Sequence, residues 1–111
     1  MEMKNINFYK ISSEQTSDVY IGSTSRSLDV RLDEHRSDYK RWTDGKSKKY
    51  CTSYKIIKYP NHRIDLIKCI ECIDKNHRLD FENELIDNDP NAINEARPGA
   101  ILRAGGVKNY I

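Results

Sequence analysis

The stretch VYIGST, residues 19–24, decides the fold of this chain. It joins β-branched and aromatic residues to a glycine, a composition typical of a strand that ends in a turn. A similar run, residues 6–11, precedes it, and the polar segment SSEQTS lies between the two. The two runs therefore predict a β-hairpin.

The register of this hairpin determines how its tyrosines are placed. If Ile11 pairs with Asp18, then Tyr9 lies opposite Tyr20. Because side chains alternate between the two faces of a strand, both rings then lie on one face of the sheet. The sequence therefore predicts two neighbouring phenol groups on that face.

A helix is expected to follow the hairpin. Ser27 is a good N-cap, and Asp29 in the first turn suits the positive end of the helix dipole. The helix should run to about Trp42 and end before Gly45.

This helix carries a polar pair on its apolar face. At about 100° per residue, the apolar side chains form one narrow arc, whose members are Leu28, Leu32, Tyr39 and Trp42. His35 projects into the middle of the arc, and Arg31 lies on its edge, one turn away. A histidine there is commonly a core residue with a satisfied hydrogen bond. A buried arginine beside it needs an anionic partner, and a phosphate is one such partner.

The second half of the chain predicts a strand and a helix. Residues 52–59 are ambiguous between a short helix and a strand, whereas residues 64–73 alternate well enough to predict a third strand. A second helix is expected over residues 77–87, because an Asn-Asp-Pro sequence follows it. Residues 92–94 form either a short extended piece or a turn.

Glu82 is the one carboxylate in the apolar stripe of this second helix. Leu79, Leu85 and Ile86 lie within about 60° of it around the helix axis. A buried carboxylate needs a cation, so Glu82 should meet either Arg31 or a metal ion. A purely structural ion pair between Arg31 and Glu82 is the alternative to a metal site.

Together these polar groups suit phosphodiester hydrolysis. That reaction needs a nucleophilic water, a proton acceptor, positive charge near the phosphate and stabilisation of the leaving oxygen. The tyrosines of the hairpin, the pair of Arg31 and His35, and Glu82 supply a candidate for each role.

Composition indicates one domain without a membrane span. The chain has 111 residues, 37% hydrophobic and 32% charged, and no run approaches the roughly 20 apolar residues that a span needs. We expect residues 1–96 to form the domain and residues 97–111 a basic C-terminal tail, docked or flexible. Three cysteines, an odd number, and an N-terminus without a secretory signal predict a protein of the cytoplasm, the nucleus or a virion, not a secreted one.

Basic residues gather in two stretches although the net charge is only +2. The first covers residues 40–58, and the second is the tail. Phosphate contacts from these residues would add salt-sensitive affinity for nucleic acid, and the alternative is a solvated surface. The nucleic-acid-binding candidates are Lys40, Arg41, Lys48, Lys49 and Lys55.

Across residues 6–94 the chain resembles the GIY-YIG endonuclease superfamily. Residues 20–22, Tyr-Ile-Gly, match its second signature, and residues 7–9, Asn-Phe-Tyr, replace the first with only the tyrosine preserved. The other matching residues are Arg31 and His35 on the first helix, Glu82 on the second, and Asn94. The family's β-β-α-β-α core is an α+β fold with a small three-stranded antiparallel sheet flanked by helices, in agreement with the elements predicted above.

The resemblance implies a metal-dependent endonuclease that hydrolyses phosphodiester bonds of DNA, expected to be double-stranded, and leaves 5′-phosphate and 3′-hydroxyl ends. Tyr9 would be the general base, Arg31 would neutralise phosphate charge, and Glu82 would hold one Mg²⁺ or Mn²⁺ ion. Tyr20 would orient water or phosphate, and Asn94 would brace the site. The implied catalytic residues are Tyr9, Tyr20, Arg31, His35, Glu82 and Asn94.

The chain is similar to short stand-alone members of that family, such as those of mobile elements and large DNA viruses. One active site per chain should nick one strand at a time, so we expect a monomer or a weak homodimer. The main alternative is a nucleic-acid-binding or interaction module of the same fold with a weakened site.

Two further features leave alternatives open. Some members of the family place another polar residue between the first helix and the third strand, for which the candidates are Tyr50, Ser53 and Lys55. A zinc module could be built on Cys51, Cys69 and Cys72 with His62 or His77. Structural zinc usually has four ligands, however, and an extended strand directs residues 69 and 72 to opposite faces.

Overall fold

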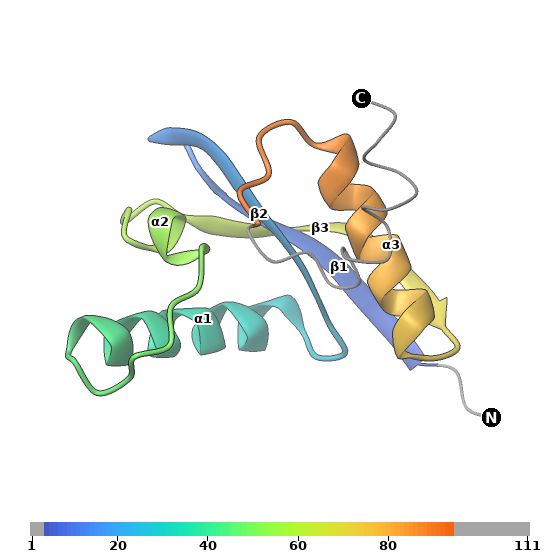
Figure 1. Ribbon diagram of the computed structural model, residues 1–111, viewed down its shortest axis with the longest axis horizontal. Helices are drawn as coiled ribbons and strands as arrows, with labels where there is room; N and C mark the ends of the chain where they lie inside the picture. The colour runs from blue at the N-terminus through green and yellow to red at the C-terminus, as the bar shows by residue number, and fades with distance from the viewer. Residues whose placement is uncertain (1–3, 95–111) are drawn as a thin grey trace.

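Three strands form one antiparallel sheet in the computed structural model, which describes residues 4–94 (Figure 1). The order across the sheet is β2-β1-β3, so the first strand is central. The elements are β1 (Lys4–Ser13), β2 (Thr16–Thr24), α1 (Leu28–Thr43), α2 (Tyr54–Ile57), β3 (Arg63–Cys72) and α3 (Lys75–Asn88). This architecture confirms the predicted α+β fold, a small antiparallel sheet with flanking helices.

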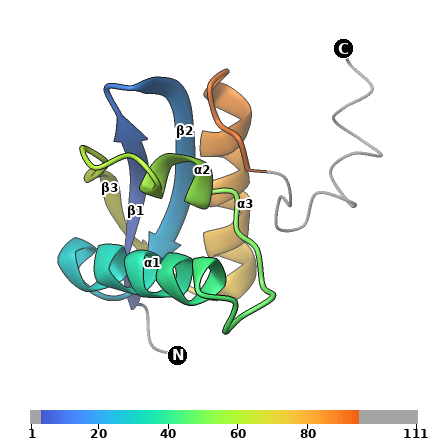
Figure 2. The same ribbon diagram turned by 90° about the vertical axis from the view of Figure 1, so that its left-hand side faces the viewer.

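Helices cover both faces of the sheet. Alternate residues of β1 point to opposite faces, and they belong to two separate apolar clusters. Tyr9 and Ile11 pack with side chains of α1 and α2, whereas Ile6 and Phe8 pack with side chains of α3. The helices α1 and α2 therefore lie on one face and α3 on the other, as Figures 1 and 2 show from two directions.

The hairpin register differs from the predicted one by two residues. Tyr9 lies opposite Gly22, and Ile11 lies opposite Tyr20, so the predicted pairing of Tyr9 with Tyr20 is wrong. The loop between the two strands is shorter than expected, because Ser13 of β1 pairs with Thr16 of β2. A shift of two residues keeps each side chain on its face, and Tyr20 packs against the same cluster as Tyr9.

Gly22 provides the physical reason for this register. A Cβ atom at residue 22 would lie 2.6 Å from Cζ of Tyr9 and nearer still to its hydroxyl oxygen. Real Cβ atoms essentially never make contacts under 3.0 Å. Only glycine therefore leaves room for the Tyr9 ring, which is completely buried.

The long helices begin and end close to the expected residues. The Ser27 side chain caps α1 by accepting a hydrogen bond from the amide of Val30, and Gly45 beyond its end has a φ of 76°. The start of α3 lies two residues before the predicted one, because Asp74 caps it by accepting from the amide of His77. Both caps satisfy amides that have no partner inside the helix.

The segments with uncertain assignments are resolved by the tertiary structure. The segment over residues 52–59 contains the short helix α2. Residues 91–93 run beside β2, where the amide of Val19 donates to the carbonyl of Asn91 and the amide of Ile93 donates to the carbonyl of Val19, each over 2.9 Å. The last described segment is therefore attached to the edge of the sheet.

None of the helices within residues 4–94 is long and apolar enough to cross a membrane. The predicted C-terminal tail, residues 97–111, lies outside the described residues.

Candidate active site

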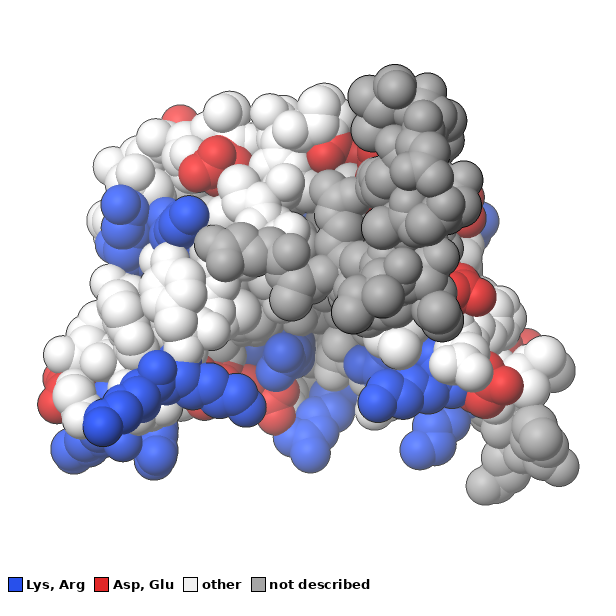
Figure 3. Space-filling model, viewed as in Figure 1, with Lys and Arg blue, Asp and Glu red and all other residues white. Residues whose placement is uncertain are grey.

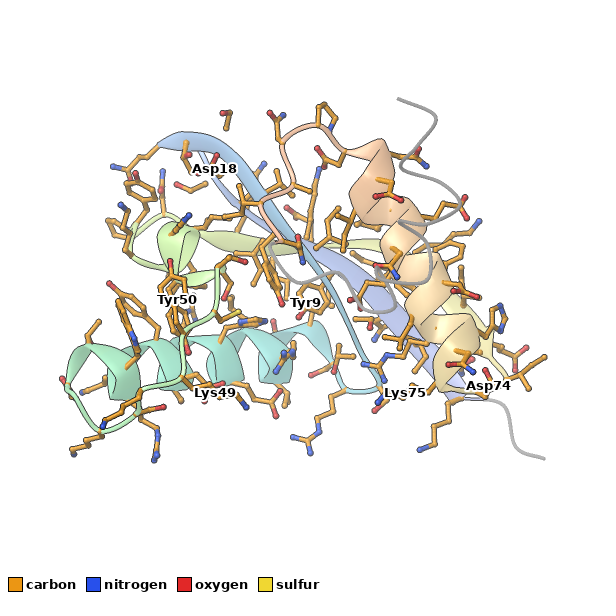
Figure 4. The ribbon with its side chains drawn as sticks, viewed as in Figure 1. Tyr9, Asp18, Lys49, Tyr50, Asp74 and Lys75 are labelled. Carbon is orange, nitrogen blue, oxygen red and sulfur yellow. The ribbon has the colours of Figure 1, made fainter. Side chains whose placement is uncertain are left out.

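A cavity of about 620 Å³ lies among β1, β2, α1 and α3. Its lining includes Tyr9 from β1, Tyr20 from β2, Arg31 from α1 and Glu82 from α3. Figure 4 shows Tyr9 near the middle of the molecule, between α1 and α3. The fold thus brings together four of the six predicted catalytic side chains from four separate elements.

The Tyr9 hydroxyl is held by two hydrogen bonds. Nε of Arg31 donates to it over 3.0 Å, and Nε2 of His35 lies 2.9 Å from it. Because arginine can only donate, the Tyr9 oxygen accepts from Arg31. In the His35 tautomer that carries its proton on Nδ1, Tyr9 donates to Nε2, and Nδ1 donates to Oγ of Ser53 over 3.1 Å. The hydrogen bonds connect Arg31, Tyr9, His35 and Ser53 in one path.

Burial and charge set the protonation states along this path. Burial raises the pKa of Tyr9 above its usual 10.0, and the neighbouring Arg31 offsets part of that rise. Burial, followed by the charge of Arg31, lowers the pKa of His35 to about 4. At neutral pH the phenol is therefore protonated and the imidazole neutral, in agreement with the hydrogen-bond directions.

His35 is buried and has a partner on each ring nitrogen. It is thus a satisfied histidine, as the structural alternative expected, but one of its partners is a phenol that lines the cavity. Tyr20 contacts the same ring edge on, with 5.5 Å between ring centroids. Burial raises the pKa of Tyr20, so a second neutral phenol lines the cavity beside the first.

Glu82 meets a serine instead of an arginine. Oγ of Ser23 donates to Oε1 of Glu82 over 2.6 Å. Arg31 pairs with Glu34 on its own helix, with 3.1 Å between Nη1 and Oε1. Within residues 4–94 no ion pair joins Arg31 to Glu82, so the structural alternative of such a pair is wrong. Arg31 and Glu82 both keep part of their polar surface toward the cavity.

A second arginine lies beside Ser23. Nε of Arg78 donates to Oγ of Ser23 over 2.8 Å, and Nη2 of Arg78 donates to the Ser23 carbonyl over 2.9 Å. Burial raises the pKa of Glu82 above its usual value, whereas the Ser23 hydrogen bond and the charges of Arg78 and Arg31 oppose that rise. The carboxylate is therefore desolvated, accepts one hydrogen bond from Ser23 and lies near two positive charges.

The cavity offers the carboxylate of Glu82, whereas the described residues contain no cluster of zinc ligands. Among the described residues there is no cluster of three or more His, Cys, Asp or Glu side chains that could hold a metal ion. Cys69 is exposed and Cys72 is buried on β3, so the two do not form the pair that a zinc module needs. Mg²⁺ commonly binds proteins through one or two carboxylates and completes its shell with water and substrate phosphates. Glu82 offers such a carboxylate in the cavity.

Asn94 acts on the main chain of β2. Its Oδ1 accepts from the amide of Ile21 over 3.1 Å, and its Nδ2 donates to the carbonyl of Ile21 over 2.7 Å. Ile21 lies between Tyr20 and Gly22, which both line the cavity. The asparagine side chain itself is outside the lining, so it supports the strand that carries the site.

Three polar side chains of this region were missed or left unresolved by the sequence. Ser23 directly follows the Tyr-Ile-Gly signature, and Arg78 lies one turn before Glu82 on α3; these two spacings were the available signals. Of the three candidates for a further polar residue, Ser53 contacts His35. Tyr50 instead packs on the ring of Trp42, with 5.1 Å between centroids.

The predicted nucleic-acid-binding side chains are all exposed. Two lie in the last turn of α1, two in the loop after it and one on α2: Lys40, Arg41, Lys48, Lys49 and Lys55. Figure 3 shows lysine and arginine side chains gathered along the lower side of this face, from α1 to the start of α3. In Figure 4, Lys49 beside α1 and Lys75 at the start of α3 lie on either side of Tyr9.

Comparison with known families agrees with this geometry. The chain matches the GIY-YIG catalytic domain over residues 5–94. Comparison with curated proteins and with solved structures finds no match. The matching family consists of nucleases that act on DNA and are generally metal-dependent. The match spans both signatures, α1, α3 and Asn94, and the chain therefore belongs to the GIY-YIG family.

Proposed function

We propose that this protein is a metal-dependent endonuclease that hydrolyses phosphodiester bonds of DNA and leaves 5′-phosphate and 3′-hydroxyl ends. The observation that carries the proposal is the Tyr9 hydroxyl, which is hydrogen-bonded to both Arg31 and His35 in a cavity that also receives Glu82. A phenol with a neutral imidazole as its acceptor and a guanidinium as its donor is prepared for proton transfer.

Tyr9 is proposed to take a proton from the attacking water. Its oxygen must first lose its own proton, for which Nε2 of His35 lies 2.9 Å away. The Arg31 guanidinium, 3.0 Å from the same oxygen, would stabilise the resulting phenolate. Burial opposes this ionisation, because it raises the pKa of Tyr9. The reaction should therefore become faster as the pH rises through neutrality.

Arg31 and Tyr20 are proposed to hold the phosphate and the water. Arg31 has a half-buried side chain at the cavity, so its charge is only partly screened by solvent. It can neutralise negative charge that develops on the phosphoryl oxygens. Tyr20 keeps its proton and can orient water or a phosphate oxygen by hydrogen bonding.

Glu82 is proposed to hold one Mg²⁺ or Mn²⁺ ion per active site. When bound, the ion would supply positive charge at the scissile phosphate and at the 3′ leaving oxygen. The place of the Glu82 carboxylate in the cavity and its Ser23 hydrogen bond support this assignment. Asn94 would keep β2 in place by its two bonds to Ile21.

The exposed basic residues are proposed to contact the backbone of double-stranded DNA. Two of them lie in the last turn of α1, two in the loop after it and one on α2, and all five are exposed. Each phosphate contact would make binding weaker at higher salt. The one site in residues 4–94 that combines Tyr9, Arg31 and Glu82 supports a monomer or weak homodimer that nicks one strand at a time.

We also propose that residues 1–96 form the nuclease domain and residues 97–111 a basic tail. The cysteines of the described chain are unpaired, which supports an intracellular protein of a host cell, as for a nuclease of a mobile element or a large DNA virus.

The test is a plasmid-nicking assay with supercoiled DNA and Mg²⁺ or Mn²⁺. The wild type should nick, EDTA should stop it, and Glu82→Ala and Tyr9→Phe should lower the rate by at least about 100-fold, as expected for loss of groups that act in the transition state. Glu84→Ala, an exposed position on the same helix, is the matched control and should nick at the wild-type rate. DNA ligase alone should reseal the nicks if the ends are 5′-phosphate and 3′-hydroxyl.

Two results would contradict the proposal. If the wild type does not nick although it binds DNA, the protein is a nucleic-acid-binding module with a weakened site. If Glu82→Ala nicks as fast as the wild type, the activity does not arise from this cavity.

A further inference from the structure

Ser23 connects a helix arginine to the cavity carboxylate. It lies on β2 directly after Gly22, whereas Arg78 and Glu82 are one turn apart on α3. Arg78 makes two hydrogen bonds to Ser23, one to the hydroxyl and one to the carbonyl. Ser23 in turn makes a hydrogen bond of 2.6 Å to Glu82. A strand and a helix are therefore joined by three hydrogen bonds at the edge of the cavity.

The chemistry of the donors fixes the direction of these bonds. Arginine has no acceptor, so the Ser23 oxygen must accept from Nε of Arg78. The single hydroxyl proton of Ser23 is then free to point only at Oε1 of Glu82. Arg78 also donates to the Ser23 carbonyl. Its guanidinium therefore makes two hydrogen bonds to Ser23, and rotation of the guanidinium would break both of them. Arg78 thus orients the Ser23 hydroxyl, and the Ser23 hydroxyl orients the Glu82 carboxylate.

The spacing of Arg78 and Glu82 makes this arrangement unusual. Residues four apart on a helix are neighbours, and an arginine and a glutamate at that spacing commonly pair directly. No ion pair between Arg78 and Glu82 is present in residues 4–94. A direct pair would occupy carboxylate oxygens with the guanidinium. With Ser23 between them, the charge of Arg78 still stabilises the Glu82 carboxylate. Only Oε1 of Glu82 is used, because it accepts the one hydrogen bond from Ser23.

We infer that Ser23 and Arg78 are positioning residues that orient the Glu82 carboxylate for a divalent cation. The inference rests on the proposed function, in which Glu82 holds the ion. Ser23 donates to one oxygen and so leaves the other free to face the cavity, and Arg78 fixes Ser23 in the orientation that does so. Partners that orient a ligand in this way typically change metal affinity by about 10- to 100-fold when they are removed.

The experiment measures Mn²⁺ binding to the DNA-free protein by electron paramagnetic resonance, together with the Mg²⁺ concentration that gives half-maximal nicking. Ser23→Ala and Arg78→Met should each weaken Mn²⁺ binding by about 10-fold or more. Ser23→Thr keeps the hydroxyl and should restore most of the affinity. The double variant should be little worse than either single variant, because both side chains act through the same carboxylate.

Matched controls separate orientation from general effects of charge and folding. Ser25→Ala removes a hydroxyl two residues further along, and Arg63→Met removes an exposed arginine on β3. Both should bind Mn²⁺ like the wild type. Thermal melts identify variants that fail to fold, and if Arg78→Met is one of them, the comparison of Ser23→Ala with Ser23→Thr still decides.

The outcomes distinguish this inference from the proposed function. If the wild type nicks, Glu82→Ala does not, and Ser23→Ala and Arg78→Met bind Mn²⁺ with wild-type affinity, the inference is wrong and the proposed function stands. If Ser23→Thr binds as weakly as Ser23→Ala, the hydroxyl is not what orients Glu82, and the inference fails. If the wild type neither binds Mn²⁺ nor nicks, both fail together.

Discussion

Substitution of Gly22 by alanine should inactivate the site by moving Tyr9. The added Cβ would lie 2.6 Å from Cζ of the Tyr9 ring, whereas ordinary contacts begin at 3.4 Å. The ring must therefore retreat by about 1 Å, and overpacking of this kind typically lowers the free energy of unfolding by about 1–3 kcal/mol. The Tyr9 hydroxyl cannot retreat while keeping both its 3.0 Å bond to Arg31 and its 2.9 Å bond to His35.

The expected effect on the reaction is larger than the effect on stability. A displacement of about 1 Å in a catalytic geometry can lower a rate by about 100-fold. The assay is plasmid nicking per folded protein, at a temperature where a melt shows that Gly22→Ala is fully folded. The predicted result is a rate about 100-fold below the wild type, with metal binding by the DNA-free protein unchanged.

Gly45→Ala is the matched control for this experiment. Gly45 has a φ of 76°, so alanine there is strained, but no atom lies within 4 Å of the new Cβ. It should lower stability by about 1 kcal/mol, through backbone strain alone, and leave nicking per folded protein unchanged. If Gly22→Ala nicks as fast as Gly45→Ala, then Tyr9 does not lie against Gly22, and the reasoning from the hairpin register is refuted.

Three further predictions concern stability. The pKa of His35 is about 4 in the folded protein because of burial and the charge of Arg31, against an ordinary 6.5. The unfolded chain therefore binds more protons between these two pKa values, and the free energy of unfolding should fall by about 3 kcal/mol as the pH falls from 6.5 to 4. His35→Gln should remove this component of the pH dependence, measured by urea unfolding. An unchanged pH dependence in this variant would contradict the prediction. Asn94→Ala should lower the free energy of unfolding by about 1–3 kcal/mol, because both hydrogen bonds to Ile21 are lost, and a melt within error of the wild type would show that the brace is unimportant. Asn83 is buried with neither amide atom hydrogen-bonded within the described chain, so Asn83→Leu should stabilise the protein by about 1–2 kcal/mol, and a clear loss of stability would indicate a hydrogen-bond partner for the amide.

Local sequence patterns were sufficient to locate the hairpin and the two long helices. The hairpin, α1 with its Ser27 cap, and α3 all follow from periodicity and from capping residues. These signals lie within a few residues of each other, so no knowledge of distant contacts is needed to find them. α3 begins two residues before the predicted start, because Asp74 is its N-cap.

Polarity within those patterns also located the unusual side chains. His35 was expected to point inward because it lies in the apolar arc of α1, and it is buried. Glu82 was expected to point inward because it lies in the stripe of α3, and it lines the cavity. In both cases the position on the helix is fixed by a rotation of about 100° per residue, which the sequence contains in full.

Contacts between elements were decided only by the tertiary structure. The sequence showed that Arg31 needs an anion, which Glu34 supplies from the same helix. Only packing between elements showed that Ser23 contacts Glu82. The sequence left three candidates for a further polar residue in the segment before β3, and the packing of that segment on α1 brings Ser53 into contact with His35.

The amino-acid sequence by itself determined the three strands, the two long helices, the inward polar residues and the family. The tertiary structure decided the short helix α2, the hairpin register and the partners of each polar group. Periodicity gives the direction of a side chain from its own element. It does not give the distance between two elements, which depends on loop length and on the volume of the side chains between them. Gly22 shows this most clearly, because its missing Cβ has a role only when the ring of Tyr9 lies opposite it.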